Sequence, residues 1–202
     1  MEDYPPVFKN HSIDQHGLWI FGYGSLMWRP GFEYVERHSA TLQGYHRAFC
    51  LYSHHHRGTP ETPGLVLGLD QGENCLGVAF RVTQESAREV VAYLDERELI
   101  GYAYTPKLLE ISLEGEMPET SRRVTAYTFV ADFNHANYAG EMEISQAAKL
   151  IMDAEGVAGL NRDYLMNTVR HLEQVGSVDT KLHSLLEMIE HLTGAIEMGS
   201  GI

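Results

Sequence analysis

The chain has 202 residues, 44% hydrophobic and 21% charged, which is enough for one domain with an apolar core. Its formal net charge of −13 argues against nucleic-acid binding, which needs a basic surface, and against attraction to anionic membranes. The only two cysteines, Cys50 and Cys75, are too few for a disulfide framework and favour a reducing compartment.

The N-terminal 17 residues are polar, include Pro5-Pro6 and contain no apolar signal run. We therefore expect a flexible arm over residues 1–17, followed by a single domain over residues 18–195. The longest apolar runs are far shorter than a membrane span, so we expect a cytoplasmic protein without a membrane partner.

Apolar and alternating runs predict β-strands in the first two thirds of the chain. The predicted strands cover residues 18–21, 42–53, 65–69, 76–82, 102–113 and 123–133. We expect residues 71–74, Gln-Gly-Glu-Asn, to form a turn, and the Pro- and Gly-rich residues 54–64 to form a loop.

Helical spacing predicts one helix among these strands and three after them. Thr83 is expected to cap the first helix, which ends around residues 98–101. The other three are predicted over residues 144–154, from a cap at Asn161 to Gly176, and from a cap at Asp179 to Gly194. We expect an α+β fold, a small closed or nearly closed β-barrel with helices packed outside it.

The first predicted strand runs into the loop Gly22-Tyr23-Gly24-Ser25, after which apolar residues return to the core. Glycines admit backbone angles closed to other residues, and successive N–H groups of such a turn can converge on an anion or a developing oxyanion. An ordinary turn is the alternative. A Walker loop is excluded because no Gly-Lys-Ser/Thr follows, and a dinucleotide fingerprint because the third glycine and the helix are missing.

The helix after Thr83 places a carboxyl group on its apolar face. At 100° per residue, residue 98 shares one arc with four apolar residues, Ala87, Val90, Val91 and Leu94. Asp95 lies at the margin of this arc and Glu96 opposite it. Burial at a helix C-terminus raises the pKa of a carboxyl, so Glu98 is a candidate acid/base. The alternative is that the helix has already ended and Glu98 is a solvated residue paired with Arg97 or Lys107.

Four motifs in order resemble the ChaC family of γ-glutamylcyclotransferases. They are Phe21–Phe32, His56–Pro60 with Pro63-Gly64, Tyr93–Glu98 with Gly101-Tyr102, and Asn161–Leu165. The resemblance spans about residues 18 to 192. It implies a γ-glutamylcyclotransferase-like fold and cleavage of glutathione to 5-oxoproline and cysteinylglycine, in the cytoplasm and without cofactor or metal.

The resemblance also implies roles for individual residues. Glu98 is expected to be the catalytic acid/base, and Tyr23-Gly24-Ser25-Leu26 to hold the γ-glutamyl group. Arg57, a plausible carboxylate partner, and Tyr102 complete the expected substrate-binding set. Leu99-Ile100 and His55 depart from residues common in the family, which bears on the fit of the Cys-Gly half.

The sequence leaves several alternatives for the loop and for the function. The loop N–H groups can hold either the γ-carbonyl oxygen or the α-carboxylate. The substrate can instead be another γ-glutamyl amino acid or amine, or the protein can be a non-catalytic small-molecule-binding regulatory module. His54-His55-His56 can in principle bind a metal, but adjacent histidines in an extended loop point in alternating directions, so no metal site is expected. The sequence does not indicate the oligomeric state.

Overall fold

The computed structural model describes residues 6–8, 13, 15–99, 103–114 and 122–199. These residues belong to two compact units. The barrel unit comprises residues 1–47 and 69–132, and the helical unit comprises residues 48–68 and 133–202.

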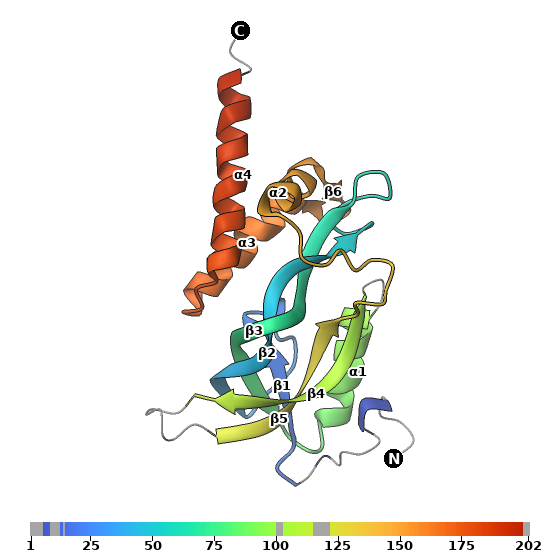
Figure 1. The fold of residues 1–202 in the computed structure, drawn as a ribbon. Coiled ribbons are helices and arrows are strands. Elements are labelled where there is room, and N and C mark those ends of the chain that lie inside the picture. Colours follow the sequence, from blue (N-terminus) through green and yellow to red (C-terminus); the bar gives the residue numbers. More distant parts are fainter. Residues whose placement is uncertain (1–5, 9–12, 14, 100–102, 115–121, 200–202) are drawn as a thin grey trace. The chain divides into compact units, whose positions relative to one another are not determined.

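Five strands close into a barrel in the order β1-β3-β2-β4-β5 (Figure 1). They are β1 (Leu18–Gly22), β2 (Glu36–Ser53), β3 (Gly64–Val82), β4 (Tyr104–Leu113) and β5 (Arg122–Ala131). The predicted α+β barrel with accompanying helices is confirmed.

The short strand β1 lies between two longer strands. It pairs antiparallel with β3, from Leu18 opposite Val82 to Gly22 opposite Val78, and parallel with β5. All five of its residues are buried, which explains why the sequence here is a continuous apolar run rather than an alternating one. The glycine-rich loop therefore starts where the last β1–β3 pair ends.

The turn predicted at residues 71–74 is wrong, because β3 is one continuous strand of 19 residues. Its neighbour β2 is 18 residues long, and continued pairing satisfies the backbone of the polar stretch without a turn. Gly72 serves close packing: a Cβ there would lie 2.2 Å from Nδ1 of His46. The glycine thus marks a close contact within the sheet, not a chain reversal.

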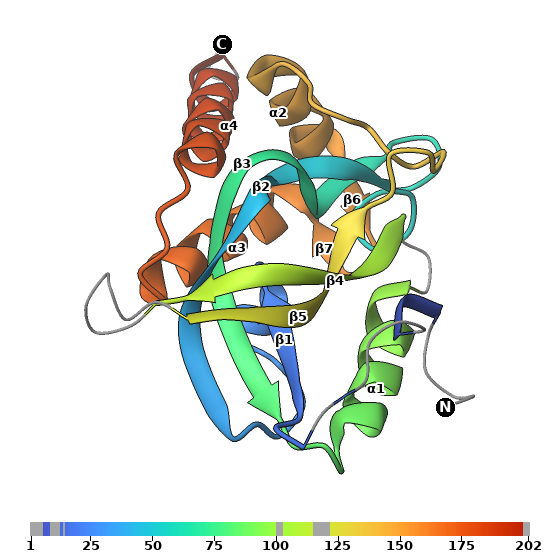
Figure 2. The same cartoon turned by 60° about the horizontal axis from the view of Figure 1, so that its bottom comes forward.

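Helix α1 (Ala87–Leu99) runs beside β4, as Figure 2 shows. The predicted cap is confirmed, because Thr83 Oγ1 accepts the N–H of Ser86 at 3.3 Å and the Thr83 carbonyl accepts that of Ala87 at 3.0 Å. The apolar stripe that includes Leu94 is buried. The cap and the stripe together fix which face of α1 points inward.

Part of the expected N-terminal arm has a defined position. Residues Pro6–Phe8 form the 3₁₀ turn η1, and the buried Phe8 ring stacks on Tyr127 with ring centroids 5.3 Å apart. Most other residues of this stretch lie outside the described ranges. The limits of the arm and of the 18–195 domain stay predictions.

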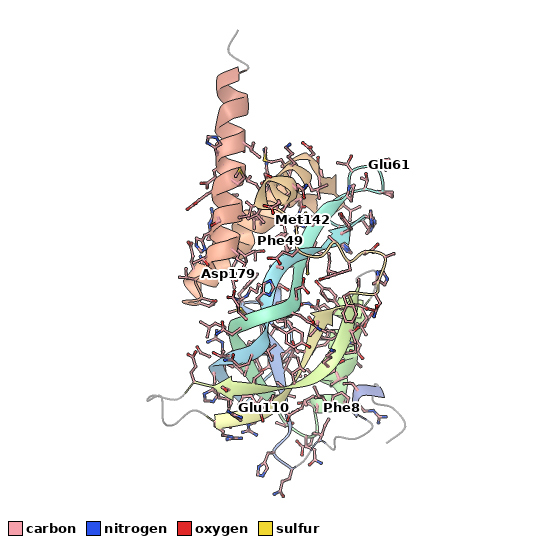
Figure 3. All side chains as sticks on the ribbon, in the orientation of Figure 1. Phe8, Phe49, Glu61, Glu110, Met142 and Asp179 are labelled. Atoms are coloured by element: carbon pink, nitrogen blue, oxygen red, sulfur yellow. The ribbon has the colours of Figure 1, made fainter. Side chains whose placement is uncertain are left out.

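The helical unit contains three mutually packed helices and a small hairpin. Its elements are α2 (Ile144–Asp153), β6 (Glu155–Gly156), β7 (Gly159–Leu160), α3 (Asn161–Gln174) and α4 (Thr180–Gly199). Asp179, labelled in Figure 3, caps α4 as predicted by accepting the N–H of Leu182 at 3.2 Å. The predicted end at Gly194 is wrong, since one glycine inside a helix costs only about 1 kcal/mol. No helix within the described ranges is long and apolar enough to cross a membrane.

Asn161 does not cap α3, which corrects the prediction. It is the first residue of the helix, and its fully buried side chain bonds to the backbone of Leu65 instead. Oδ1 accepts the Leu65 N–H at 2.7 Å and Nδ2 donates to the Leu65 carbonyl at 2.8 Å. Satisfying two buried backbone groups outweighs a helix cap, which solvent can partly replace.

Replacing Asn161 with alanine is expected to destabilise the protein by about 2–4 kcal/mol, because both Leu65 groups become unsatisfied. Urea denaturation measures the effect. The control Asn167→Ala, at an exposed position of the same helix, is expected to stay within about 0.5 kcal/mol of the parent. Equal midpoints for both variants would contradict this role of Asn161.

Candidate functional site

The glycine-rich loop is a tight turn held at both ends. After β1, residues Ser25–Met27 form the 3₁₀ turn η2, in which the Met27 N–H donates to the Gly24 carbonyl at 2.9 Å. Leu26 and Met27 are buried and anchor the turn, whereas Ser25 is exposed. The predicted polar loop between apolar anchors is thus present.

The two loop glycines differ in what they supply. Gly24 has φ −132° and ψ −129°, which lie outside the main helical and extended regions, whereas Gly22 has no positive φ. A Cβ on Gly22 would instead lie 2.8 Å from Cβ of Leu26, and one on Gly77 would lie 2.5 Å from the Gly22 carbonyl oxygen. The glycines therefore bring the main chain of the turn close to its neighbours.

The internal hydrogen bonds of the turn use only its later N–H groups. The N–H groups of Met27, Trp28 and Arg29 bond back to carbonyls of residues 24 and 25. For the three preceding N–H groups, those of residues 24–26, the described part of the chain offers no acceptor. Such neighbouring donors are suited to bind an oxyanion or a carboxylate.

A buried arginine supports the turn from the barrel side. Arg47 on β2 is only 3% exposed, and its Nε donates to the Tyr23 carbonyl at 2.5 Å. Its Nη2 donates to the Leu76 carbonyl and approaches Sδ of Met27 at 3.5 Å. The sequence analysis assigned residue 47 to a predicted strand but gave it no role. The hydrogen bond from Arg47 therefore fixes the orientation of the Tyr23 carbonyl toward β2.

Glu98 lies in the last turn of α1, which continues to Leu99. The alternative in which the helix ends before residue 98 is therefore wrong. The Glu98 side chain is only 21% exposed, and burial raises its pKa above the usual range, while the charge of Arg97 offsets part of that rise. A carboxyl with a raised pKa exchanges protons more readily near neutral pH.

Arg97 connects the loop to Glu98. Its Nη2 donates to Ser25 Oγ at 2.8 Å, and its Nε lies 3.2 Å from Oε1 of Glu98. Its Nη1 donates to the carbonyls of Arg29 at 2.9 Å and Pro30 at 3.2 Å. One planar group thus contacts both predicted parts of the site. The sequence offered Arg97 only as a partner for a solvated Glu98.

The far end of the loop also rests on α1. Gly31 has φ +79°, a left-handed conformation that favours glycine, and a Cβ there would lie 2.1 Å from the Tyr93 hydroxyl oxygen. That hydroxyl accepts from Arg97 Nη1 at 3.1 Å. The loop and the last two turns of α1 therefore form one packed substructure.

A second carboxyl ties α1 to the barrel wall. The hydroxyl of the fully buried Tyr127 on β5 donates to Oδ1 of Asp95, three residues before Glu98. Burial raises the pKa of Asp95, and the Tyr127 bond partly counters this; burial and Asp95 both raise the pKa of Tyr127. The bond fixes the end of α1 that bears Glu98.

Two predicted substrate-binding residues belong to other parts of the chain. Tyr102 lies outside the described residues. Arg57 belongs to the helical unit, where its Nη1 donates to the carbonyls of Ala158 and Leu160 and its guanidinium lies 5.0 Å from the Tyr164 ring centroid. Its role as a carboxylate partner stays a prediction.

No group of three His, Cys, Asp or Glu side chains among the described residues is placed to hold a metal ion. The rings of His55 and His56 pack edge to face, with centroids 5.0 Å apart. The cluster around Glu98 is instead suited to acid/base chemistry, with a buried carboxyl, an adjacent guanidinium and a turn rich in N–H donors.

Comparison with known proteins gives consistent matches. The model of the family described as ChaC-like protein matches residues 18–192. A glutathione-specific gamma-glutamylcyclotransferase of Escherichia coli (strain K12) is 37% identical over 179 residues, 89% of this chain and 75% of that protein. Gamma-glutamylcyclotransferase 2-3 of Arabidopsis thaliana is 34% identical over 186 residues, with 89% and 92% covered. The crystal structure of a glutathione-specific gamma-glutamyl cyclotransferase from yeast aligns with TM-score 0.76 and 26% identity, over 87% of this chain and 96% of that one.

Replacing Tyr127 with phenylalanine is expected to cost about 1–3 kcal/mol of stability at neutral pH, because the half-buried Asp95 carboxylate loses its donor. The pKa of Asp95 should then rise further, so the loss should shrink as Asp95 becomes protonated at acid pH. Urea denaturation at several pH values tests this, with Tyr34→Phe at an exposed tyrosine as control. A midpoint equal to that of the parent at neutral pH would contradict it.

Proposed function

Because this chain belongs to the ChaC-like protein family, we propose that it is a γ-glutamylcyclotransferase that cleaves glutathione to 5-oxoproline and cysteinylglycine. The relatives named above bear that activity or its class in their names. The observation that supports the proposal most directly is the Arg97 guanidinium, which contacts both the Ser25 hydroxyl and the buried Glu98 carboxyl.

The proposed reaction is internal to the substrate. The α-amine nitrogen of the glutamyl group attacks its own γ-carbonyl carbon, and the new C–N bond closes a five-membered lactam. The amide bond to cysteine breaks, and the proton lost by the amine ends on the departing cysteine nitrogen. Water, oxidant and covalent enzyme intermediate are not needed. Since nucleophile and electrophile are already tethered, the enzyme has to select the folded conformer.

Glu98 is the proposed acid/base. It takes a proton from the α-ammonium and then gives one to the leaving nitrogen. An α-amino group titrates near ~8 and an exposed Glu near ~4.3, so transfer to an ordinary carboxylate is uphill by about 5 kcal/mol. Each unit by which burial raises the pKa of Glu98 removes about 1.4 kcal/mol of this mismatch. Positioned acid/base catalysis of this kind contributes about 10²–10⁴-fold.

The turn is the proposed holder of the γ-glutamyl group. The N–H groups of Gly24, Ser25 and Leu26 can donate to a substrate oxygen that gains charge in the transition state. Tyr23 contributes its backbone to this turn, and Arg47 donates a hydrogen bond to the Tyr23 carbonyl. Arg57 and Tyr102 stay in the proposed binding set for the remaining polar groups of glutathione.

A cytoplasmic location fits this substrate. Glutathione keeps cytosolic thiols reduced, and both Cys50 and Cys75 are buried and form no disulfide. We propose no partner beyond the small-molecule substrate.

The purified protein is expected to release 5-oxoproline from reduced glutathione without added metal. Glu98→Gln is expected to lower kcat by about 10²–10⁴-fold while staying folded, because the amide keeps the shape but cannot accept the proton. The matched control is Glu96→Gln, an exposed glutamate of the same helix, which is expected to retain full activity. 5-Oxoproline formation is measured by chromatography.

Three outcomes would contradict the role of Glu98, the substrate or the catalytic function proposed here. An active Glu98→Gln variant would refute the role of that residue. Faster turnover of γ-glutamylalanine than of glutathione would make another γ-glutamyl compound the substrate. Binding of glutathione without any 5-oxoproline would point to a non-catalytic binding module.

The pH dependence should reflect the raised pKa of Glu98. The general base must be deprotonated, so kcat/KM should fall as pH drops through the pKa of Glu98 in the free enzyme. Because burial raises that pKa, the acid limb should lie above the pH at which an exposed glutamate titrates. A pH profile between 4 and 9 tests this, and an acid limb centred at the ordinary glutamate value would contradict it.

A further inference from the structure

We propose that Arg97 binds the α-carboxylate of the γ-glutamyl group, so that Arg97 and Glu98 together hold the two charged groups on its α-carbon. The inference rests on the proposed function. It assigns a substrate-binding role to a residue outside the set predicted from the sequence.

The donors of Arg97 are almost fully used. A guanidinium has five N–H donors, one on Nε and two on each terminal nitrogen. Nε faces Glu98, and Nη1 faces three acceptors, the carbonyls of Arg29 and Pro30 and the Tyr93 hydroxyl. Nη2 donates one hydrogen to Ser25 Oγ, and no acceptor for its second hydrogen exists among the described residues. One charged donor is therefore available beside Ser25.

This donor is both accessible and fixed. The Nη2–Ser25 bond lies in an exposed position, so a ligand can reach that nitrogen. The three acceptors at Nη1 hold the plane of the guanidinium before any ligand arrives. A fixed guanidinium loses less conformational freedom on binding a carboxylate than a mobile one does.

The charges match those of the substrate. The glutamyl α-carbon bears one ammonium and one carboxylate group, whereas Arg97 and Glu98 present one cation and one anion with Nε and Oε1 3.2 Å apart. A zwitterion placed against this pair puts its carboxylate on Arg97 and its ammonium on Glu98. The ammonium is the group that Glu98 must deprotonate, so the same pairing delivers the nucleophile to its base.

The assignment also decides between the two tasks left open for the loop. With the α-carboxylate on Arg97, the N–H groups of residues 24–26 are left for the γ-carbonyl oxygen. That oxygen gains charge when the amine attacks, so donors aimed at it stabilise the transition state more than the ground state.

The test compares two substrates that differ only in the α-carboxylate. One is glutathione and the other is 4-aminobutyryl-cysteinylglycine, which keeps the amine and the γ-carbonyl and would release 2-pyrrolidinone. The wild-type enzyme is expected to prefer glutathione in kcat/KM by about 10- to 150-fold, the size of a hydrogen bond between charged groups. In Arg97→Gln this preference should fall to nearly one, and Arg97→Lys should keep part of it.

The ratio of the two substrates separates binding from loop positioning. If Arg97 only holds the loop, its loss will slow both substrates equally and the preference will be unchanged, which overturns the inference. Each variant is assayed on the plateau of its own pH profile, because removing the Arg97 charge also changes the pKa of Glu98. Arg88→Gln, an exposed arginine of the same helix, is the control and should keep the full preference.

Circular dichroism identifies variants that fail to fold. If Arg97→Gln does not fold, Arg97→Lys decides: a reduced preference supports the inference and an unchanged one overturns it. Equal kcat/KM for both substrates in the wild type overturns it without any variant. Failure of the proposed function looks different, since no 5-oxoproline would then form from glutathione with any form of the protein.

Discussion

The organisation of the candidate site depends on one guanidinium group, that of Arg97. It contacts the Ser25 hydroxyl, two carbonyls of the following turn and the Glu98 carboxyl, so the loop and the end of α1 share one support. Arg97 and Glu98 are consecutive residues of a helix, and a shift of one residue in its register would rotate both by 100°. The Thr83 cap and the Asp95–Tyr127 bond at the two ends of the helix therefore also determine the geometry of the site.

Most of the fold was readable from local patterns, and two of the errors have a common cause. Apolar runs and helical stripes indicated the strands and helices, and the caps at Thr83 and Asp179 were correct because a cap bonds to its own helix. The turn expected at residues 71–74 and the cap expected at Asn161 were wrong because partners distant in sequence decide these positions. Neighbouring β2 keeps the polar stretch of β3 extended, and Leu65 takes both polar atoms of Asn161.

The candidate site was predictable to the extent that it follows from periodicity. Counting 100° per residue placed Glu98 on the buried face of its helix, and the structure agrees. The same count says nothing about what a charged side chain reaches, so the contacts of Arg97 with the loop and of Arg47 with Tyr23 were not foreseen. An arginine on an otherwise apolar face of a strand, as at position 47, is rarely buried without a partner and so indicates a specific contact.

Arg47 has a consequence for how this fold can change over time. Its positively charged guanidinium donates to the Tyr23 carbonyl from an almost fully buried position. Removing that charge from water is nevertheless costly, and well-packed apolar residues at such sites are often neutral or stabilising. Selection for a more robust barrel alone would thus favour losing this arginine, and the turn above it would lose its anchor. The presence of Arg47 is therefore better explained by its support of the turn than by a gain in barrel stability.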